Sequence, residues 1–71
     1  MSLGNYLVDL SKQDIEVRMF KHRDTPYILR ISVTKNKKMN FQGIHLNEFK
    51  DSILTPDDLL RLHIEQAVKG L

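Results

Sequence analysis

Two successive segments alternate apolar and polar residues, and this alternation constrains the fold more than any other feature of the sequence. Residues 15–20 read IEVRMF and residues 27–34 read YILRISVT. Strict alternation is typical of a half-buried β-strand, because successive side chains of a strand point to opposite faces of its sheet. Between the two segments lie Asp24 and Pro26, both favoured in turns. The segments are therefore predicted to form antiparallel strands.

A further strand is predicted on each side of this pair. Residues 6–10, YLVDL, alternate in the same way. On the C-terminal side, the polar run KNKK at 35–38 is typical of a hairpin loop, and it leads to a strand in which Met39 and Phe41 share one face. The sequence thus indicates three or four antiparallel strands in a row.

The pattern of the last strand changes at Gly43. Unbroken alternation from Phe41 would turn Gly43 toward the core, whereas the neighbouring Ile44 is the residue suited to burial. Glycine adopts φ > 0 without steric cost, so a glycine at a change of phase indicates a bulge or bend. We therefore predict that the strand slips by one residue at Gly43.

The C-terminal stretch carries the strongest helix signals in the chain. Thr55 is a favourable N-cap residue, and Pro56 is suited to the first helical position. One apolar stripe at helical spacing follows, made of Leu60, Ile64, Ala67, Val68 and Leu71. Before this helix, residues 47–53 are predicted to form a short helical turn with Phe49 beside Ile53. Packing the helix on one sheet face gives an α+β domain of two layers.

The short chain allows a single domain. Residues 1–3 are typical of an expression leader, so the domain is assigned to residues 4–71. A domain of this size buries only about 60% of the surface that its unfolded chain exposes, so a homodimer is expected. The chain has no cysteine, which fits a cytoplasmic location, and its apolar runs of two or three residues are too short to cross a membrane.

The charge is distributed unevenly along the chain. Residues 1–45 hold eight Lys/Arg against four Asp/Glu, while residues 46–71 hold three against five. This asymmetry favours an anionic partner for the first part, although an ordinary solvated surface would show a similar mixture. The sheet face turned away from the helix is predicted to carry Arg18, Phe20, His22, Arg30, Ser32, Thr34, Asn40 and Gln42.

A basic face with an aromatic residue is typical of proteins that bind single-stranded nucleic acid. Cations contact the phosphates there, and aromatic rings stack on the bases. The predicted nucleic-acid-binding residues are Arg18, Phe20, Arg30, Lys35, Lys37 and Lys38.

Catalytic and metal-binding patterns are missing from the sequence. No two of the three histidines stand at a metal-ligand spacing, and the three glycines are too far apart for a phosphate-binding loop. The adjacent Asp57 and Asp58 are explained by the first turn of a helix, where the macrodipole favours negative charge. We expect a non-catalytic binding module without a cofactor or metal ion.

The segment GIHLN at 43–47, with the basic hairpin before it and the helix after it, resembles the Whirly-like, coactivator-type single-stranded-DNA-binding domains. The order of elements is similar over residues 15–70, and the identical positions are Gly43, Ile44, Leu46 and Asn47. The resemblance implies dimerisation through the helix and binding of a single strand on the curved sheet. In that family the helix follows the last strand directly, whereas here Pro56 restarts it.

A second resemblance starts at the same glycine. GIHLNEF followed by TPDDLLRLHIE is similar, over about 29 residues, to the C-terminal half of the small dimeric uracil-DNA glycosylase inhibitors of Bacillus phages. The matching positions are Gly43, Leu46, Phe49, Thr55, Asp57 and Leu62. This resemblance implies an alternative function, a phage-type inhibitor or adaptor that binds a host DNA-repair enzyme through Glu48, Phe49 and Asp51. Those inhibitors are acidic DNA mimics, whereas this chain is basic overall.

Overall fold

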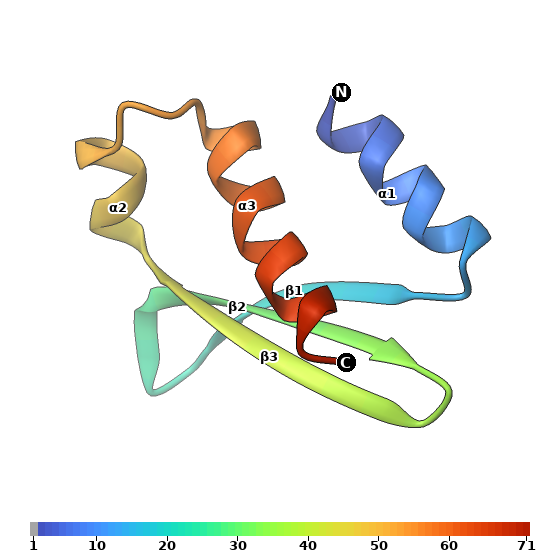
Figure 1. Ribbon diagram of the computed structural model, residues 1–71. Helices are drawn as coiled ribbons and strands as arrows, with labels where there is room; N and C mark the ends of the chain where they lie inside the picture. Colours follow the sequence, from blue (N-terminus) through green and yellow to red (C-terminus); the bar gives the residue numbers. More distant parts are fainter. Residues whose placement is uncertain (1) are drawn as a thin grey trace.

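The computed structural model describes residues 2–71 as a three-stranded antiparallel sheet with three helices (Figure 1). Along the chain the elements are α1 (Leu3–Lys12), β1 (Glu16–His22), β2 (Thr25–Lys35), β3 (Lys38–His45), α2 (Leu46–Asp51) and α3 (Pro56–Lys69). The strands pair in the order β1-β2-β3. The α+β class, the three-stranded antiparallel sheet and the C-terminal helix are therefore as predicted.

The N-terminal segment is a helix, so the strand predicted at 6–10 is wrong. Ser2 is the N-cap of α1, and its Oγ accepts a hydrogen bond from the backbone N–H of Asn5 at 3.2 Å. The apolar residues recur at helical spacing, and those that contact the core are Leu3, Tyr6, Leu7 and Leu10. The five residues 6–10 are too few to separate the two-residue period of a strand from the 3.6-residue period of a helix. Met1, the first residue of the predicted leader, lies outside the described residues.

The two alternating segments form β1 and β2, as predicted. Val17 lies opposite Val33, and Met19 lies opposite Ile31. Ile31 and Val33 are fully buried beneath the helices. The next turn, predicted at 35–38, is also present, and Asn36 and Lys37 have the positive φ values (52° and 66°) that tight hairpin turns need.

The predicted slip at Gly43 is absent. The register between β2 and β3 runs without a shift along all of β3, and no glycine in the described chain has a positive φ. Ile44 is fully buried. β3 therefore alternates without interruption, and the buried Ile44 shows which of its faces lies toward the core.

The faces of β3 are consequently opposite to the prediction. Asn40 and Gln42 lie on the helix side, where Gln42 is opposite the buried Ile31 and the Asn40 Nδ2 donates to the Ala67 carbonyl oxygen of α3 at 2.9 Å. Met39 and Phe41, predicted to face the core, point away from the helices. The side-chain amide of Asn40 finds its partner in a helix end 27 residues away, which no local pattern reveals.

The C-terminal helix begins where predicted. The Thr55 Oγ1 accepts a hydrogen bond from the Asp58 N–H at 3.2 Å, and Pro56 opens α3. The shorter α2 ends at Asp51, so the predicted contact between Phe49 and Ile53 does not form: Phe49 packs against the core, and Ile53 is wholly exposed.

One hydrophobic core joins the helices to the sheet. Its buried members are Leu10, Ile15, Ile31, Val33, Ile44, Leu59, Ile64 and Ala67. Figure 1 shows α1 and α3 over the same face of the sheet, so the opposite face has no helix upon it. No helix within residues 2–71 is long and apolar enough to span a membrane.

Candidate nucleic-acid interface

The sheet face turned away from α1 and α3, called the outer face below, is built from every second residue of each strand. Cross-strand pairing arranges these residues in rows, because directly opposed residues of antiparallel strands share a face. The rows are Glu16–Thr34–Met39, Arg18–Ser32–Phe41 and Phe20–Arg30–Gly43. Two phenylalanines and two arginines therefore lie on one face.

The outer face is hollowed. The hollow has a volume of about 680 Å³ and is lined by the outer-face residues Glu16, Arg18, Phe20, Ser32, Thr34, Met39 and Phe41, and by Met19, whose register position lies on the helix side. Its large apolar side chains are open to solvent: Phe20 is 41% exposed, Phe41 52% and Met39 58%. Exposed apolar side chains that gather in one hollow are typical of a binding site.

Arg18 and Arg30 supply positive charge beside the two rings. Arg18 stands in the same row as Phe41, and Arg30 in the same row as Phe20. The Arg18 Nε donates to the Glu16 Oε1 at 2.7 Å, and both side chains are more than half exposed. An exposed ion pair of this kind contributes little to stability, so an anionic ligand can displace Glu16 at small cost.

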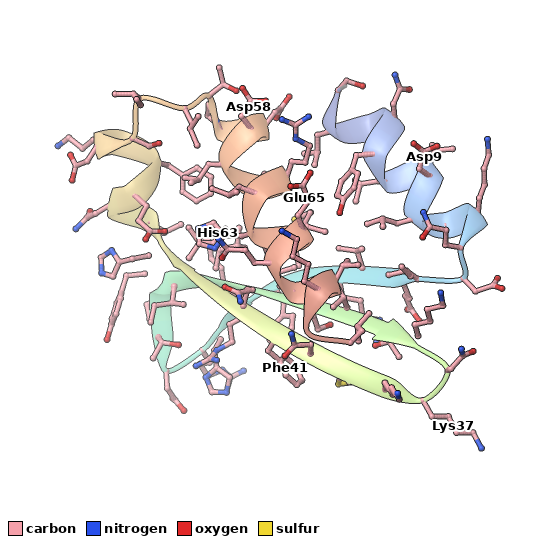
Figure 2. The ribbon with its side chains drawn as sticks, in the orientation of Figure 1. Asp9, Lys37, Phe41, Asp58, His63 and Glu65 are labelled. Carbon is pink, nitrogen blue, oxygen red and sulfur yellow. The ribbon has the colours of Figure 1, made fainter. Side chains whose placement is uncertain are left out.

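The three predicted lysines lie apart from this group, at the end of the sheet. Lys35 and Lys38 oppose each other, and with Asn36 and Leu71 they line a separate hollow of about 220 Å³. Leu71 follows α3 and packs against the core, so this hollow is on the helix side. Figure 2 shows Lys37 at the tip of the hairpin, far along the sheet from Phe41.

Phe41 and Met39 are the residues of the outer face that the sequence prediction missed. Their assignment to the core followed from the supposed slip at Gly43. Ile44 carried the correct signal, because it is the residue of β3 that is fully buried, and strict alternation from it exposes Phe41.

Charge is segregated between the sheet and the helices. The strands and their two turns, residues 16–45, hold seven Lys/Arg against two Asp/Glu, whereas the rest of the chain holds four against seven. The sheet is thus strongly basic and the helical part acidic, which the overall charge of +2 conceals.

The residues of the alternative function lie elsewhere, where α2 meets α3. A hollow of about 300 Å³ is lined there by Glu48, Asp51, Ser52 and Leu59. Phe49, the third predicted contact, is partly buried against the core. The following loop exposes Ile53 completely (102%) and Leu54 by 40%. We call Glu48, Asp51, Ile53 and Leu54 the α2–α3 corner.

His63 of α3 connects this corner to the helix behind it. Its Nε2 lies 3.5 Å from the Glu48 Oε2, while its Nδ1 is buried without a hydrogen-bond partner. Figure 2 shows His63 on α3, facing the region between α3 and α2. No other titratable group is near enough to make a metal site: within residues 2–71 no three His, Cys, Asp or Glu side chains gather to hold an ion.

Comparison with known proteins does not assign either surface. A scan of protein-family models and searches of curated proteins and of solved structures return no match to this chain.

Proposed function

We propose that this protein is a non-catalytic module that binds single-stranded nucleic acid on its outer face. The observation that carries the proposal is the presence of Phe20 and Phe41 on one hollowed, solvent-open face beside Arg18 and Arg30. Aromatic rings bind unpaired bases by stacking, and guanidinium groups bind phosphates through paired hydrogen bonds. The basic charge of the sheet supports the same partner.

The spacing of the rings suits two separate bases. Phe20 and Phe41 lie on the two edge strands and in adjacent rows. Strand spacing and residue rise then place their Cα atoms about 12 Å apart. One base cannot reach both rings, so a strand would cross the sheet diagonally with one base on each ring and a phosphate near Arg18 or Arg30.

Titration of a labelled oligonucleotide at two salt concentrations tests this proposal. Phe41→Ala should weaken binding about 5- to 150-fold, because one stacked base contributes about 1–3 kcal/mol. Arg18→Ala and Arg30→Ala should each weaken binding and lower its salt dependence by about one phosphate contact. Tyr27→Ala, which removes an exposed ring outside the hollow, is the matched control. Unchanged affinity in Phe41→Ala, or no binding at low salt, would overturn the proposal.

The α2–α3 corner supports a second candidate function, binding of a host protein such as a DNA-repair enzyme. The favouring observation is Ile53, a wholly exposed isoleucine that directly follows Ser52 of the hollow lined by Glu48 and Asp51. An apolar knob with acidic neighbours fits a protein groove that normally receives DNA phosphates. Phe49 would contribute only the part of its ring that the core leaves open.

Uracil excision by a purified bacterial uracil-DNA glycosylase tests this second candidate. Inhibition by the wild-type protein should disappear in Ile53→Asp and weaken in Glu48→Lys, because the first removes the knob and the second reverses the charge. Phe41→Ala, on the outer face, should inhibit as strongly as the wild type. A glycosylase that stays fully active in excess wild-type protein would exclude inhibition of uracil-DNA glycosylase as the function of the corner.

We also propose that the functional unit is a cytoplasmic homodimer of two-layer protomers. The small domain leaves five large apolar side chains of the strands at least 39% exposed: Met19, Phe20, Tyr27, Met39 and Phe41. Burial of some of these in a second copy would add the hydrophobic stabilisation that so short a chain lacks.

A further inference from the structure

The edge strand β1 is left uncovered. Of its seven residues only Val17 is partly buried, and the other six are exposed. Met19 lies opposite the fully buried Ile31 yet is 39% exposed, so the helices shield β2 but cover β1 only around Val17. An exposed edge presents unpaired N–H and C=O groups that a further strand can join.

The other edge strand, β3, is better covered on its helix side. Its residue Ile44 is fully buried under the helices, and the side chain of Asn40 is bonded to the end of α3. The β3 edge therefore has a covered helix side, whereas β1 has apolar side chains open on both faces: Met19 toward the helix side and Phe20 on the outer face.

We propose that β1 pairs antiparallel with β1 of a second copy, so that two three-stranded sheets join into one sheet of six strands. The two copies are related by a two-fold axis perpendicular to the sheet, which keeps both outer faces on the same side. The occupant is a second copy because an antiparallel copy of the same strand sets Glu16 against His22 and Arg18 against Phe20, with an exposed methionine at the centre. The inference gives the proposed homodimer its interface, but its evidence does not depend on what the outer face binds.

Self-complementarity fixes the register. If Met19 faces Met19 of the second copy, all seven residues of the strand take part. Arg18 then stands opposite Phe20, a cation–π pair, and Glu16 stands opposite His22. The two copies thus repeat each favourable pair twice, once on each side of the axis.

The neighbouring registers are worse. Centring the pair on Arg18 opposes two arginines directly, and like charges in opposed positions are destabilising. Centring it on Phe20 opposes Arg18 to His22 and leaves only residues 18–22 paired, and centring it on Val17 uses only residues 16–18 of the strand.

Joining the sheets in this way would bring the outer hollows of the two copies together. Glu16, Arg18 and Phe20 line the hollow and also lie on the edge strand, so they would stand at the seam between the copies. Each Phe20 would meet the arginine of the other copy. Two separate hollows would become one continuous surface with four phenylalanine rings.

Single-cysteine variants give a direct test, because the chain has no cysteine of its own. Met19→Cys should be joined into a dimer by a short bis-maleimide, because the two thiols face each other at the axis. Val17→Cys and Lys21→Cys should each stay monomeric under the same reagent, and an equimolar mixture of the two should give a dimer. Val8→Cys, on the exposed side of α1, is the control for random collision.

The crosslinking results separate the possible arrangements. Cross-linking of Met19→Cys no greater than that of Val8→Cys would overturn the inference. A mixture of Val17→Cys and Lys21→Cys that reacts no better than either alone would also overturn it, since another register or surface would then be in contact.

The oligomeric state provides an independent measurement. Sedimentation of the wild-type chain from about 1 to 500 μM should pass from monomer to dimer, since an interface of one strand pair is small. Met19→Lys should remain monomeric throughout with an unchanged circular dichroism spectrum, because the side chain is already partly exposed. A wild-type chain that stays monomeric at every concentration refutes the dimer even if it binds oligonucleotide. A dimer without oligonucleotide binding refutes the proposed function alone.

Discussion

The bond between Asn40 of β3 and the Ala67 carbonyl of α3 ties the helix side of β3 to the end of α3, and a double-mutant cycle can measure it. The donor–acceptor distance is 2.9 Å, in a partly buried position. The same carbonyl also accepts the Gly70 N–H at 3.1 Å, so Asn40→Ala does not leave it unpaired. We therefore expect Asn40→Ala to cost only about 1 kcal/mol of unfolding free energy.

Gly70 is coupled to this bond through space. A Cβ atom at position 70 would collide with the side-chain amide of Asn40, whereas the φ of Gly70, −83°, suits any residue. Gly70→Ala should therefore destabilise the wild type by expelling the amide. With Asn40 already replaced by alanine, the same change should stabilise by about 0.5 kcal/mol, because alanine lowers the entropy of the unfolded chain.

Urea unfolding of the four proteins, followed by circular dichroism at one protein concentration, gives the coupling energy. We expect about 1 kcal/mol or more, with the effect of Gly70→Ala changing sign between the two backgrounds. Gly4→Ala is the control, because nothing lies within 4 Å of a Cβ at position 4. Equal effects of Gly70→Ala in both backgrounds would refute the proposed contact between Asn40 and the end of α3.

Three further changes test the rest of the fold. Gly43→Ala should alter the unfolding free energy by less than about 1 kcal/mol, because the strand is regular there and the nearest atom to the new Cβ, in Ile28, is 3.4 Å away; a loss of several kcal/mol in urea unfolding would favour a bulge instead. Burial, with the Glu65 carboxylate adding to it, raises the pKa of Tyr6, so the neutral phenol stabilises the fold below about pH 10 and this stability falls as the pH rises toward the raised pKa. Tyr6→Phe should flatten that alkaline decline in urea unfolding between pH 8 and 11, and an equally steep decline would contradict the assignment. Thr55→Ala removes the cap of α3 and should cost about 1 kcal/mol, measured by thermal unfolding; no change would show that the cap is not used.

The elements that depend on short sequence patterns, namely two strands, one hairpin and the start of the C-terminal helix, could be predicted from the sequence. The alternation of residues 15–20 and 27–34 identified β1 and β2, and the polar run at 35–38 identified the hairpin. Thr55 and Pro56 identified the start of α3. The N-terminal helix was missed because Tyr6, Val8 and Leu10 fit a strand pattern as well as a helical one in so short a window.

The orientation of β3 was decided by tertiary contacts that the sequence does not display. Met39 and Phe41 are large and apolar like core residues, yet the helix side of that strand holds the buried Ile44 and the partly buried, polar Asn40 and Gln42. The amide of Asn40 is accommodated there because α3 ends within hydrogen-bonding distance. The sequence therefore predicted Arg18, Phe20 and Arg30 of the candidate interface, and Phe41 was missed because alternation was counted from Met39 and Phe41 rather than from Ile44.

The separation of the basic sheet from the acidic helices affects how a polyanion would approach the molecule. The molecule measures 17 Å along its shortest principal axis. At physiological ionic strength, charges are screened over about 8 Å. The negative charges of the helices, on the far side of the domain, therefore have little effect on a ligand at the outer face of the sheet. A phosphate chain near the outer face would experience chiefly the cations of the strands and turns rather than the molecule's small overall charge. Diluting the buffer would extend the reach of the acidic side as well, so the rate of capture should rise less steeply at very low salt than the basic strands alone would produce.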